Sequence, residues 1–212
     1  MDSGAIVVAA TLVVLSYVAG SIPFGVVVAR LTGAPDPRLS GSGRTGGTNA
    51  LRTMGRRRAL LVVAGDVLKG AIPVLVARWI TGNAAVEVLC AIAAILGSTR
   101  SMFVGFRGGR GVGTSVGTML VIFPPAILVG TPVFIGVILA TRYVSLGSLV
   151  AIATGAALIV LWWLVANGAV PGVYLVYASL GAALVFIAHA DNIDRLIHGT
   201  ERRFDLSLLS RD

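Results

Sequence analysis

A glycine-rich loop with two arginines lies between two apolar stretches of this chain. Residues 97–114 read GSTRSMFVGFRGGRGVGT, and their centre places Arg107 and Arg110 among Gly108, Gly109 and Gly111. Glycines let backbone N–H groups turn towards a ligand, and a guanidinium presents a planar fork of donors that matches phosphate oxygens. The loop runs into an apolar stretch, so it also offers a helix N-terminus that favours an anion. The pattern predicts a phosphate-binding loop; a basic loop flanking a membrane, without a ligand, is the alternative.

A second polar segment, residues 39–52, has the groups to hold a phosphate and a neighbouring hydroxyl. It reads LSGSGRTGGTNALR and carries Ser42, Thr48, Asn49 and Arg52. Its glycines formally satisfy GxGxxG, but no strand precedes them, so a dinucleotide-binding fold is excluded. Ligand binding is the functional interpretation, and a solvated flexible loop is the alternative.

Two further polar groups follow in the second half of the chain. The turn at residues 142–148 (RYVSLGS) adds a guanidinium and the Ser148 hydroxyl. In the tail, His189, Asn192 and Arg195 have i, i+3, i+6 spacing, so on a helix they share one broad face. By itself the turn is typical of an interfacial anchor, and a lone histidine at an interface is more often structural than catalytic.

The composition places these motifs in a membrane protein. Of 212 residues, 56% are hydrophobic and 12% charged, with a mean hydropathy of +0.92, whereas soluble proteins have ~25% charged residues. The apolar runs are continuous rather than short and alternating, which favours helices over a β-barrel. The formal net charge of +8 does not indicate nucleic acid here, because in a membrane protein the position of the charges matters more than their sum. We expect an all-α integral membrane protein whose partner is the lipid bilayer.

Seven apolar stretches are candidate membrane spans. They cover approximately residues 5–29, 59–79, 84–96, 112–123, 126–141, 144–166 and 171–188. Pro23 predicts a kink or break near the end of the first, because proline removes a helix hydrogen bond. The fourth is short for a ~30 Å hydrocarbon core, so a re-entrant segment is the alternative there. Asp66 and Lys69 lie in the second at i, i+3 spacing, which predicts an ion pair.

The distribution of basic residues predicts the orientation. Seven spans with the N-terminus outside put residues 30–58, 97–111, 142–148 and the tail 189–212 on the cytoplasmic side. Of the 17 lysines and arginines, all except Lys69 and Arg78 lie in these segments. The turns at 123–125 and 167–170 carry none. We expect a single domain, residues 1–212, with every polar motif on one face.

Neither a metal nor a cofactor is expected. Cys90, the only cysteine, lies in an apolar run and has no partner for an intramolecular disulfide. The carboxylates are few and scattered, and no zinc spacing, Walker loop, EF-hand loop or Gly-x-Ser-x-Gly elbow occurs.

Taken together, the motifs resemble those of the bacterial membrane-bound acyl-phosphate:glycerol-3-phosphate acyltransferases. The resemblance covers nearly the whole chain and rests on six motifs in order: residues 20–25 (GSIPFG), 41–52, 66–70 (DVLKG), 106–112 (FRGGRGV), 142–148 and 189–201. It implies a compact bundle of seven membrane helices in the inner membrane, crossing it several times, with a cytoplasmic active site. It also implies acyl transfer from acyl-phosphate to the 1-hydroxyl of glycerol 3-phosphate in phospholipid synthesis, which yields 1-acyl-glycerol-3-phosphate and phosphate.

The resemblance also implies roles for particular residues. Ser42, His189 and Asn192 would serve catalysis, with Ser148 lining the reaction centre beside them. The implied substrate-binding residues are Thr48, Asn49, Arg52, Arg107, Gly108, Gly109, Arg110, Gly111 and Ser148. Because an acyl-phosphate is already activated and its leaving phosphate accepts the attacking hydroxyl's proton, we expect direct transfer without an acyl-enzyme.

This chain departs from the family pattern at several positions, and other functions stay open. Residues 97–101 read GSTRS where Gly-His-x-Phe-Pro is usual, Arg44 replaces an asparagine, and Arg107 and Arg110 replace lysines. The alternatives are a divergent paralogue with altered or lost activity, a membrane transporter of anions or lipid phosphates, and a non-catalytic assembly factor. A transporter would carry polar groups through several spans, whereas, apart from Arg78 at an outer end, the charged residues of these spans are only Asp66, Lys69 and Glu87.

Overall fold

The computed structural model describes residues 2–166 and 170–205, which form helices and connecting segments without a strand. The first apolar stretch gives α1 (Ser3–Ser21) and α2 (Phe24–Thr32). Between them Ile22 has ψ 117°, because a residue before proline is pushed out of the helical region. The break predicted at Pro23 is confirmed. Residues 167–169, in the turn 167–170, and residues 206–212 of the predicted tail lie outside the described residues.

The segment at residues 30–58, which we predicted as a polar loop, is partly helical. It contains the end of α2, a 3-10 turn η1 (Pro37–Leu39), α3 (Gly47–Met54) and the start of α4 (Arg56–Thr81). α3 is amphipathic and buries Ala50 and Met54 in a small apolar cluster with residues of α2 and α4. Burying this apolar face holds the polar segment over the end of the bundle.

The remaining helices follow the predicted apolar stretches closely. They are α5 (Ala84–Thr99), the 3-10 turn η2 (Met102–Val104), α6 (Val112–Ile122), α7 (Pro125–Thr141), α8 (Val144–Val165), α9 (Tyr174–Ala188) and α10 (Ala190–Ile197). Gly111, at φ 78°, precedes α6, and Arg142, at φ 64°, ends α7. A sharp turn thus stands at each of these polar motifs.

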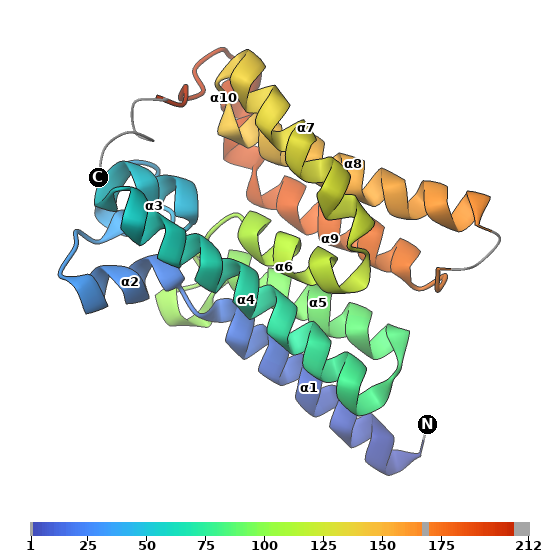
Figure 1. The fold of residues 1–212 in the computed structure, drawn as a ribbon. Coiled ribbons are helices and arrows are strands. Elements are labelled where there is room, and N and C mark those ends of the chain that lie inside the picture. Colours follow the sequence, from blue (N-terminus) through green and yellow to red (C-terminus); the bar gives the residue numbers. More distant parts are fainter. Residues whose placement is uncertain (1, 167–169, 206–212) are drawn as a thin grey trace.

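The helices form two groups that meet across α5 and α6 (Figure 1). α1, α4, α5 and α6 pack together in the first group, and α7, α8 and α9 pack together in the second. α5 joins the groups by packing against α9, and the largest core cluster lies there, around Ile95, Ile159 and Val185. This arrangement leaves α4 and α7 facing each other over α6.

Close packing of α4 on α6 depends on two glycines. A Cβ at Gly117 would clash with the carbonyl oxygen of Val67, and a Cβ at Gly70 would clash with that of Thr114. The missing side chains let the two backbones touch, which fixes the N-terminus of α6 against the middle of α4.

The membrane class is confirmed by these helices, whereas seven spans and the orientation remain predictions. Among the described residues, α1, α4, the segment Ala84–Val104 and α8 are long and apolar enough to cross a membrane. α9 and α10 make a fifth span if the pair, bent by 64°, is taken as one. α6 has 11 residues and is about 16 Å long at 1.5 Å per residue, so by itself it is shorter than a ~30 Å hydrocarbon core.

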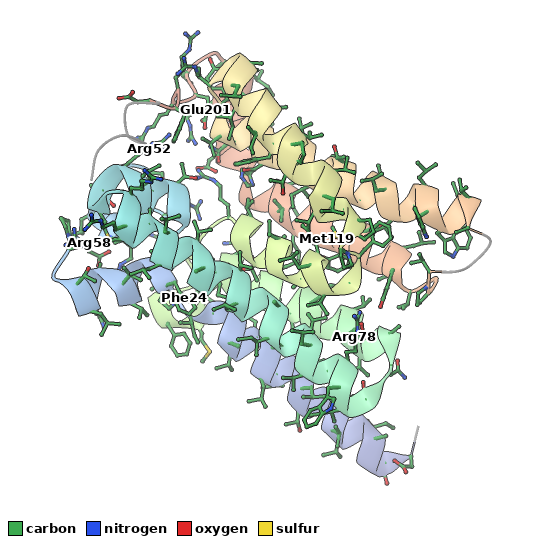
Figure 2. The ribbon with its side chains drawn as sticks, in the orientation of Figure 1. Phe24, Arg52, Arg58, Arg78, Met119 and Glu201 are labelled. Carbon is green, nitrogen blue, oxygen red and sulfur yellow. The ribbon has the colours of Figure 1, made fainter. Side chains whose placement is uncertain are left out.

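The ends of α4, α5 and α9 are joined by a partly buried polar cluster, in which Glu87 and Tyr174 are buried and Arg78 is exposed. Arg78 Nη2 lies 2.7 Å from Glu87 Oε2, and the Tyr174 hydroxyl donates to the same oxygen at 3.1 Å. Arg78 lies at the opposite end of α4 from Arg52 and Glu201 (Figure 2). The cluster therefore stabilises the end of the bundle that is remote from the polar motifs.

Candidate active site

The polar motifs converge on one pocket of about 680 Å³, a usual size for a small-molecule site. Its walls come from the segment 42–52, α4, the glycine loop at 109–113, the facing sides of α7 and α8, and residues 189–204. We call this cavity the main pocket. The prediction that the motif segments share one end of the molecule is confirmed by this common lining.

Asn49 organises the first polar segment. Its Nδ2 donates to the carbonyl oxygens of Pro37, Ser40 and Arg44 at 2.6, 3.2 and 2.9 Å, and its Oδ1 accepts from the Ser42 backbone at 2.9 Å. This amide is thus occupied by the loop backbone, and only 3% of the residue is exposed. The geometry favours a positioning role for Asn49 over the substrate contact that the resemblance implied.

Arg52 is a half-buried guanidinium on the wall of the main pocket. Among the described residues no carboxylate forms a salt bridge with it. Burial lowers the pKa of Arg52, and the neighbouring Arg202 guanidinium lowers it further. Arg52 lies towards the same end of the molecule as Glu201 (Figure 2). Glu201 acts in the opposite direction but makes no salt bridge with Arg52, so the two guanidiniums on this pocket wall favour a bound anion.

The glycine loop folds against the end of α5 and delivers α6 to the pocket. The backbone N–H groups of Gly108 and Gly109 donate to the carbonyls of Thr99 and Ser98, at 3.2 and 3.0 Å. α6 begins at Val112, directly after the left-handed Gly111, and the Ser115 N–H donates to the Gly111 carbonyl across the first turn. The N–H groups of residues 112–114 lie in this first turn, where a helix offers them no acceptor of its own. Residues 111–113 line the pocket. The helix N-terminus expected here is confirmed, and it suits an anion.

Arg110 ties the glycine loop to the tail. Its Nη2 lies 3.0 Å from Asp191 Oδ2, and Arg195 Nη2 lies 3.4 Å from the same oxygen. Arg110 Nε is buried and has no hydrogen-bond partner among the described residues, so one donor remains for a ligand. Although burial opposes it, the surrounding arginines lower the pKa of Asp191 and keep this carboxylate ionised.

Glu201 holds the other end of the tail. It accepts from the hydroxyl of Ser145 at 2.8 Å, from Nδ2 of Asn192 at 2.6 Å and from Nε of Arg195 at 2.8 Å. Further on, the Phe204 N–H donates to the Arg142 carbonyl at 2.6 Å, so the tail crosses the α7–α8 turn and closes one side of the pocket. With Nδ2 engaged, Asn192 keeps its buried Oδ1 without a partner among the described residues. That oxygen is an available acceptor.

His189 lies at the bend between α9 and α10 and is 2% exposed. Its Nδ1 is 2.8 Å from the Val185 carbonyl oxygen, which only accepts, so Nδ1 carries the proton. Burial lowers the pKa of His189 to about 4, so the ring is neutral near pH 7 and Nε2 is an acceptor. Its orienting partner is a backbone carbonyl rather than a carboxylate, unlike the histidine of a serine triad.

The ion pair predicted between Asp66 and Lys69 is confirmed and lies beneath the α6 N-terminus. Lys69 Nζ is 2.7 Å from Asp66 Oδ1 and donates to the Ile22 carbonyl at 3.0 Å. Both residues line the main pocket. Lys69 thereby fixes the α1–α2 break and forms part of the pocket floor.

The main pocket is strongly cationic. Among the described residues that line it, three carboxylates (Asp66, Asp191 and Glu201) face seven basic side chains (Arg44, Arg52, Arg56, Lys69, Arg110, Arg195 and Arg202). Setting aside Arg56, which has an interaction of its own, six basic side chains against three carboxylates leave an excess of about three positive charges, with His189 neutral. A phosphomonoester carries about −1.5 to −2 charges at pH 7, so the excess matches two of them.

The other half of the main pocket is apolar. Leu60 and Val63 of α4 face Phe134 and Ile138 of α7 across it. Leu60 is 60% exposed and Val63 44% exposed, so this edge opens onto the lipid side of the bundle. The cavity therefore joins a cationic compartment to an apolar opening, which suits an amphipathic ligand.

Most of the site residues named from the sequence reach the main pocket. It is lined by Ser42, Thr48, Asn49, Arg52, Gly109, Arg110, Gly111, Ser148, His189 and Asn192. Arg107 and Gly108 do not line it: Arg107 is exposed, and Gly108 is buried against Ser98, where a Cβ would clash with the carbonyl oxygen. The loop turns at Gly109, so its two arginines point to different surroundings.

Several residues of the pocket were missed as site residues. Arg44 donates to the Gly108 carbonyl at 3.3 Å, Asp191 pairs with Arg110, and Glu201 and Arg202 come from the tail. The i, i+4 spacing of Asp191 and Arg195 was the one local signal available for this group. The other contacts join segments far apart in sequence.

Comparison with known proteins shows close relatives over most of the chain. The family model described as "Glycerol-3-phosphate acyltransferase" matches residues 10–199. The relative named "Glycerol-3-phosphate acyltransferase 3" from Dehalococcoides mccartyi (strain CBDB1) is 41% identical, covering 91% of this chain and 94% of its own length. "Glycerol-3-phosphate acyltransferase" from Pseudomonas aeruginosa (strain PAO1) is 40% identical, covering 91% and 98%.

Solved structures share the fold. The crystal structure of PlsY (YgiH), described as an integral membrane glycerol 3-phosphate acyltransferase in its glycerol 3-phosphate form, matches with a TM-score of 0.85 and 38% identity. Its lysophosphatidic acid form matches with a TM-score of 0.84 and 37% identity. Each match covers 95% of this chain and 98% of the other.

Proposed function

Because the chain belongs to the glycerol-3-phosphate acyltransferase family, we propose that it acylates glycerol 3-phosphate in the bacterial plasma membrane as a step of phospholipid synthesis. The donor is an acyl-phosphate and the acceptor group is the 1-hydroxyl. The products are 1-acyl-glycerol-3-phosphate (lysophosphatidic acid) and phosphate. The observation that carries this proposal is the main pocket, whose cationic half has an excess charge suited to two phosphates and whose apolar half suits an acyl chain.

The acceptor is supported by the relatives and by the polar groups of the pocket. The PlsY crystal form is named for glycerol 3-phosphate. In this chain the half-buried Arg52 lacks a carboxylate partner among the described residues and offers a fork for the acceptor's phosphate. Ser42 and Thr48 line the same pocket and offer hydroxyls for the glycerol.

The donor's phosphate fits the part of the cationic half around Arg110. Arg110 has its buried Nε unpartnered among the described residues, and the N–H groups at the start of α6 are next to it. Both suit the phosphate of the acyl-phosphate. The acyl chain then leaves the carbonyl carbon towards Phe134 and Ile138.

The chemistry is a direct transfer. The 1-hydroxyl oxygen attacks the carbonyl carbon, the bond from that carbon to the bridging phosphate oxygen breaks, and the hydroxyl proton passes to the departing phosphate. His189 Nε2 and Asn192 Oδ1 are acceptors that orient the hydroxyl before attack. Cys90 is buried in another cluster, and the described residues contain no serine with a histidine–carboxylate pair. A direct step is therefore favoured over an acyl-enzyme.

The test is acylation by the purified protein in detergent or vesicles. With palmitoyl-phosphate and glycerol 3-phosphate, we expect equal amounts of lysophosphatidic acid and phosphate, and no phosphate release when the acceptor is omitted. Palmitoyl-coenzyme A in place of palmitoyl-phosphate tests the donor. Product formed only from the thioester would refute the donor, and a stable mass increase of the protein by one palmitoyl group would refute direct transfer.

A further inference from the structure

A second, smaller cavity branches from the main pocket between α6, α7 and α8. Its volume is about 120 Å³, and we call it the tail branch. Val112, Val116, Phe134 and Ser148 line both cavities, so the two adjoin at the level of the reaction centre. The branch wall is apolar apart from three hydroxyls, and that of Ser148 already donates to the Val144 carbonyl at 2.9 Å.

We propose that the tail branch holds the methyl end of the acyl chain, and that Gly130 and Met119 set the longest chain that it accepts. This inference rests on the proposed function and deepens it, because it assigns the acyl chain a place and a limit. The lining shared with the main pocket identifies the occupant: a chain held by its head at the cationic half reaches the branch by passing Phe134.

The size of the branch limits what enters it. An apolar cavity of about 150 Å³ holds a benzene ring, so 120 Å³ accommodates about four or five carbon atoms. The remaining carbons lie in the apolar half of the main pocket. Chain-length selection thus depends on the last few methylenes rather than on the whole tail.

Gly130 keeps the α7 side of the branch open. A Cβ there would meet only the Ala151 carbonyl oxygen, at 3.6 Å, which is an ordinary contact. An added Cβ therefore causes no backbone clash, and because Gly130 lines the branch, a larger side chain takes up space in it. Gly136 is the matched control, because it is on the same helix, is exposed, and has nothing within 4 Å of an added Cβ.

Met119 closes the deep end. Its side chain lines the tail branch and also a void of about 10 Å³ that is lined by α5, α6, α8 and α9. Figure 2 places Met119 on α6, inside the bundle. It is 7% exposed, and its Cε would lie 3.2 Å from a Cβ added at Gly155. Shortening this flexible side chain joins the branch to the void and lengthens it.

The kinetic test compares acyl-phosphates of 12, 14, 16 and 18 carbons at saturating glycerol 3-phosphate. For Gly130→Leu we expect kcat/KM to fall by about fourfold for each methylene displaced from the branch, with the 12-carbon donor least affected. Met119→Ala should move the optimum to longer chains, whereas Met119→Leu and Gly136→Leu should keep the wild-type order. An unchanged order in Gly130→Leu and Met119→Ala, or an equal loss at all lengths, overturns the proposal.

A second measurement is independent of turnover and of variant folding. Wild-type protein is irradiated with lysophosphatidic acid that carries a diazirine at the last carbons of a 16-carbon chain. We expect crosslinks to residues of α6, α7 and α8 around Met119 and Gly130. Crosslinks confined to Leu60 and Val63 of α4 would overturn the proposal. If acyl-phosphate is not the donor, the kinetic arm reports that failure and crosslinking still locates the chain.

Discussion

Replacing Arg52 by alanine separates substrate binding from folding, because Arg52 makes no salt bridge among the described residues. Burial lowers the pKa of Arg52, the nearby Arg202 guanidinium lowers it further, and the nearby Glu201 carboxylate raises it. Removing the charge breaks no salt bridge, and the loss of the attraction to Glu201 is opposed by relief of the repulsion from Arg202. We expect thermal stability in detergent to stay the same or to rise slightly.

The magnitude follows from what Arg52 offers to an anion. A hydrogen bond to a charged group contributes about 1.5 to 3 kcal/mol, which corresponds to about 10- to 150-fold in affinity. We expect Arg52→Ala to raise KM for glycerol 3-phosphate by about that factor, with a smaller effect on KM for the acyl-phosphate. Arg52→Lys should recover part of the loss, because it restores the charge without the planar fork.

Initial rates measured at varied concentrations of glycerol 3-phosphate give the KM that tests this assignment, and Arg57→Ala is the matched control. Arg57 is exposed at the start of α4 and does not line the main pocket. A KM within twofold of the wild-type value in Arg52→Ala would refute the assignment. So would an equal change in Arg57→Ala, since that would reflect the overall surface charge rather than one contact.

The remaining predictions concern the glycine loop, the histidine and the remote polar cluster. Gly108→Ala should destabilise the loop, since its Cβ would clash with a carbonyl at the end of α5, whereas Gly109→Ala should fold normally and raise KM for a phosphorylated substrate; melting curves and initial rates distinguish them. Because burial lowers the pKa of His189 to about 4, its neutral form contributes stability that is fully present above pH ~6.5 and is lost as pH falls towards 4; denaturation midpoints should follow this in the wild type and less in His189→Gln. Glu87→Gln should lower the melting temperature by weakening the pair with Arg78 while kcat per folded molecule stays within twofold, and a large loss of kcat at constant stability would contradict that separation.

Hydropathy and local spacing predict much of this molecule. The apolar stretches become helices at the expected places, the break at Pro23 occurs, and Asp66 pairs with Lys69. These features depend on residues close together in sequence. The order of apolar stretches and turns along the chain likewise predicts that the polar motif segments lie at the same end of the bundle.

The features that sequence reasoning missed depend on contacts between distant segments. Neither the pairing of Arg110 with Asp191 nor the bond from the Phe204 N–H to Arg142 has a local pattern. Arg107 and Arg110 have equivalent neighbours in sequence, yet only the second lines the pocket, because the backbone between them is fixed by the end of α5. Asn49 was expected to contact substrate, but its amide is occupied by three carbonyls that only the folded loop brings together.

The edge between Leu60 of α4 and Ile138 of α7 has a consequence for how the proposed reaction is measured. A fatty donor reaches that edge by diffusing within the leaflet, while the acceptor and the released phosphate exchange with the aqueous phase. The rate then depends on the mole fraction of donor in the membrane rather than on its bulk molarity. Adding inert lipid to the vesicles at a constant bulk concentration of donor should slow turnover, because the mole fraction of donor falls. Adding more vesicles of the same composition should leave the rate per enzyme unchanged.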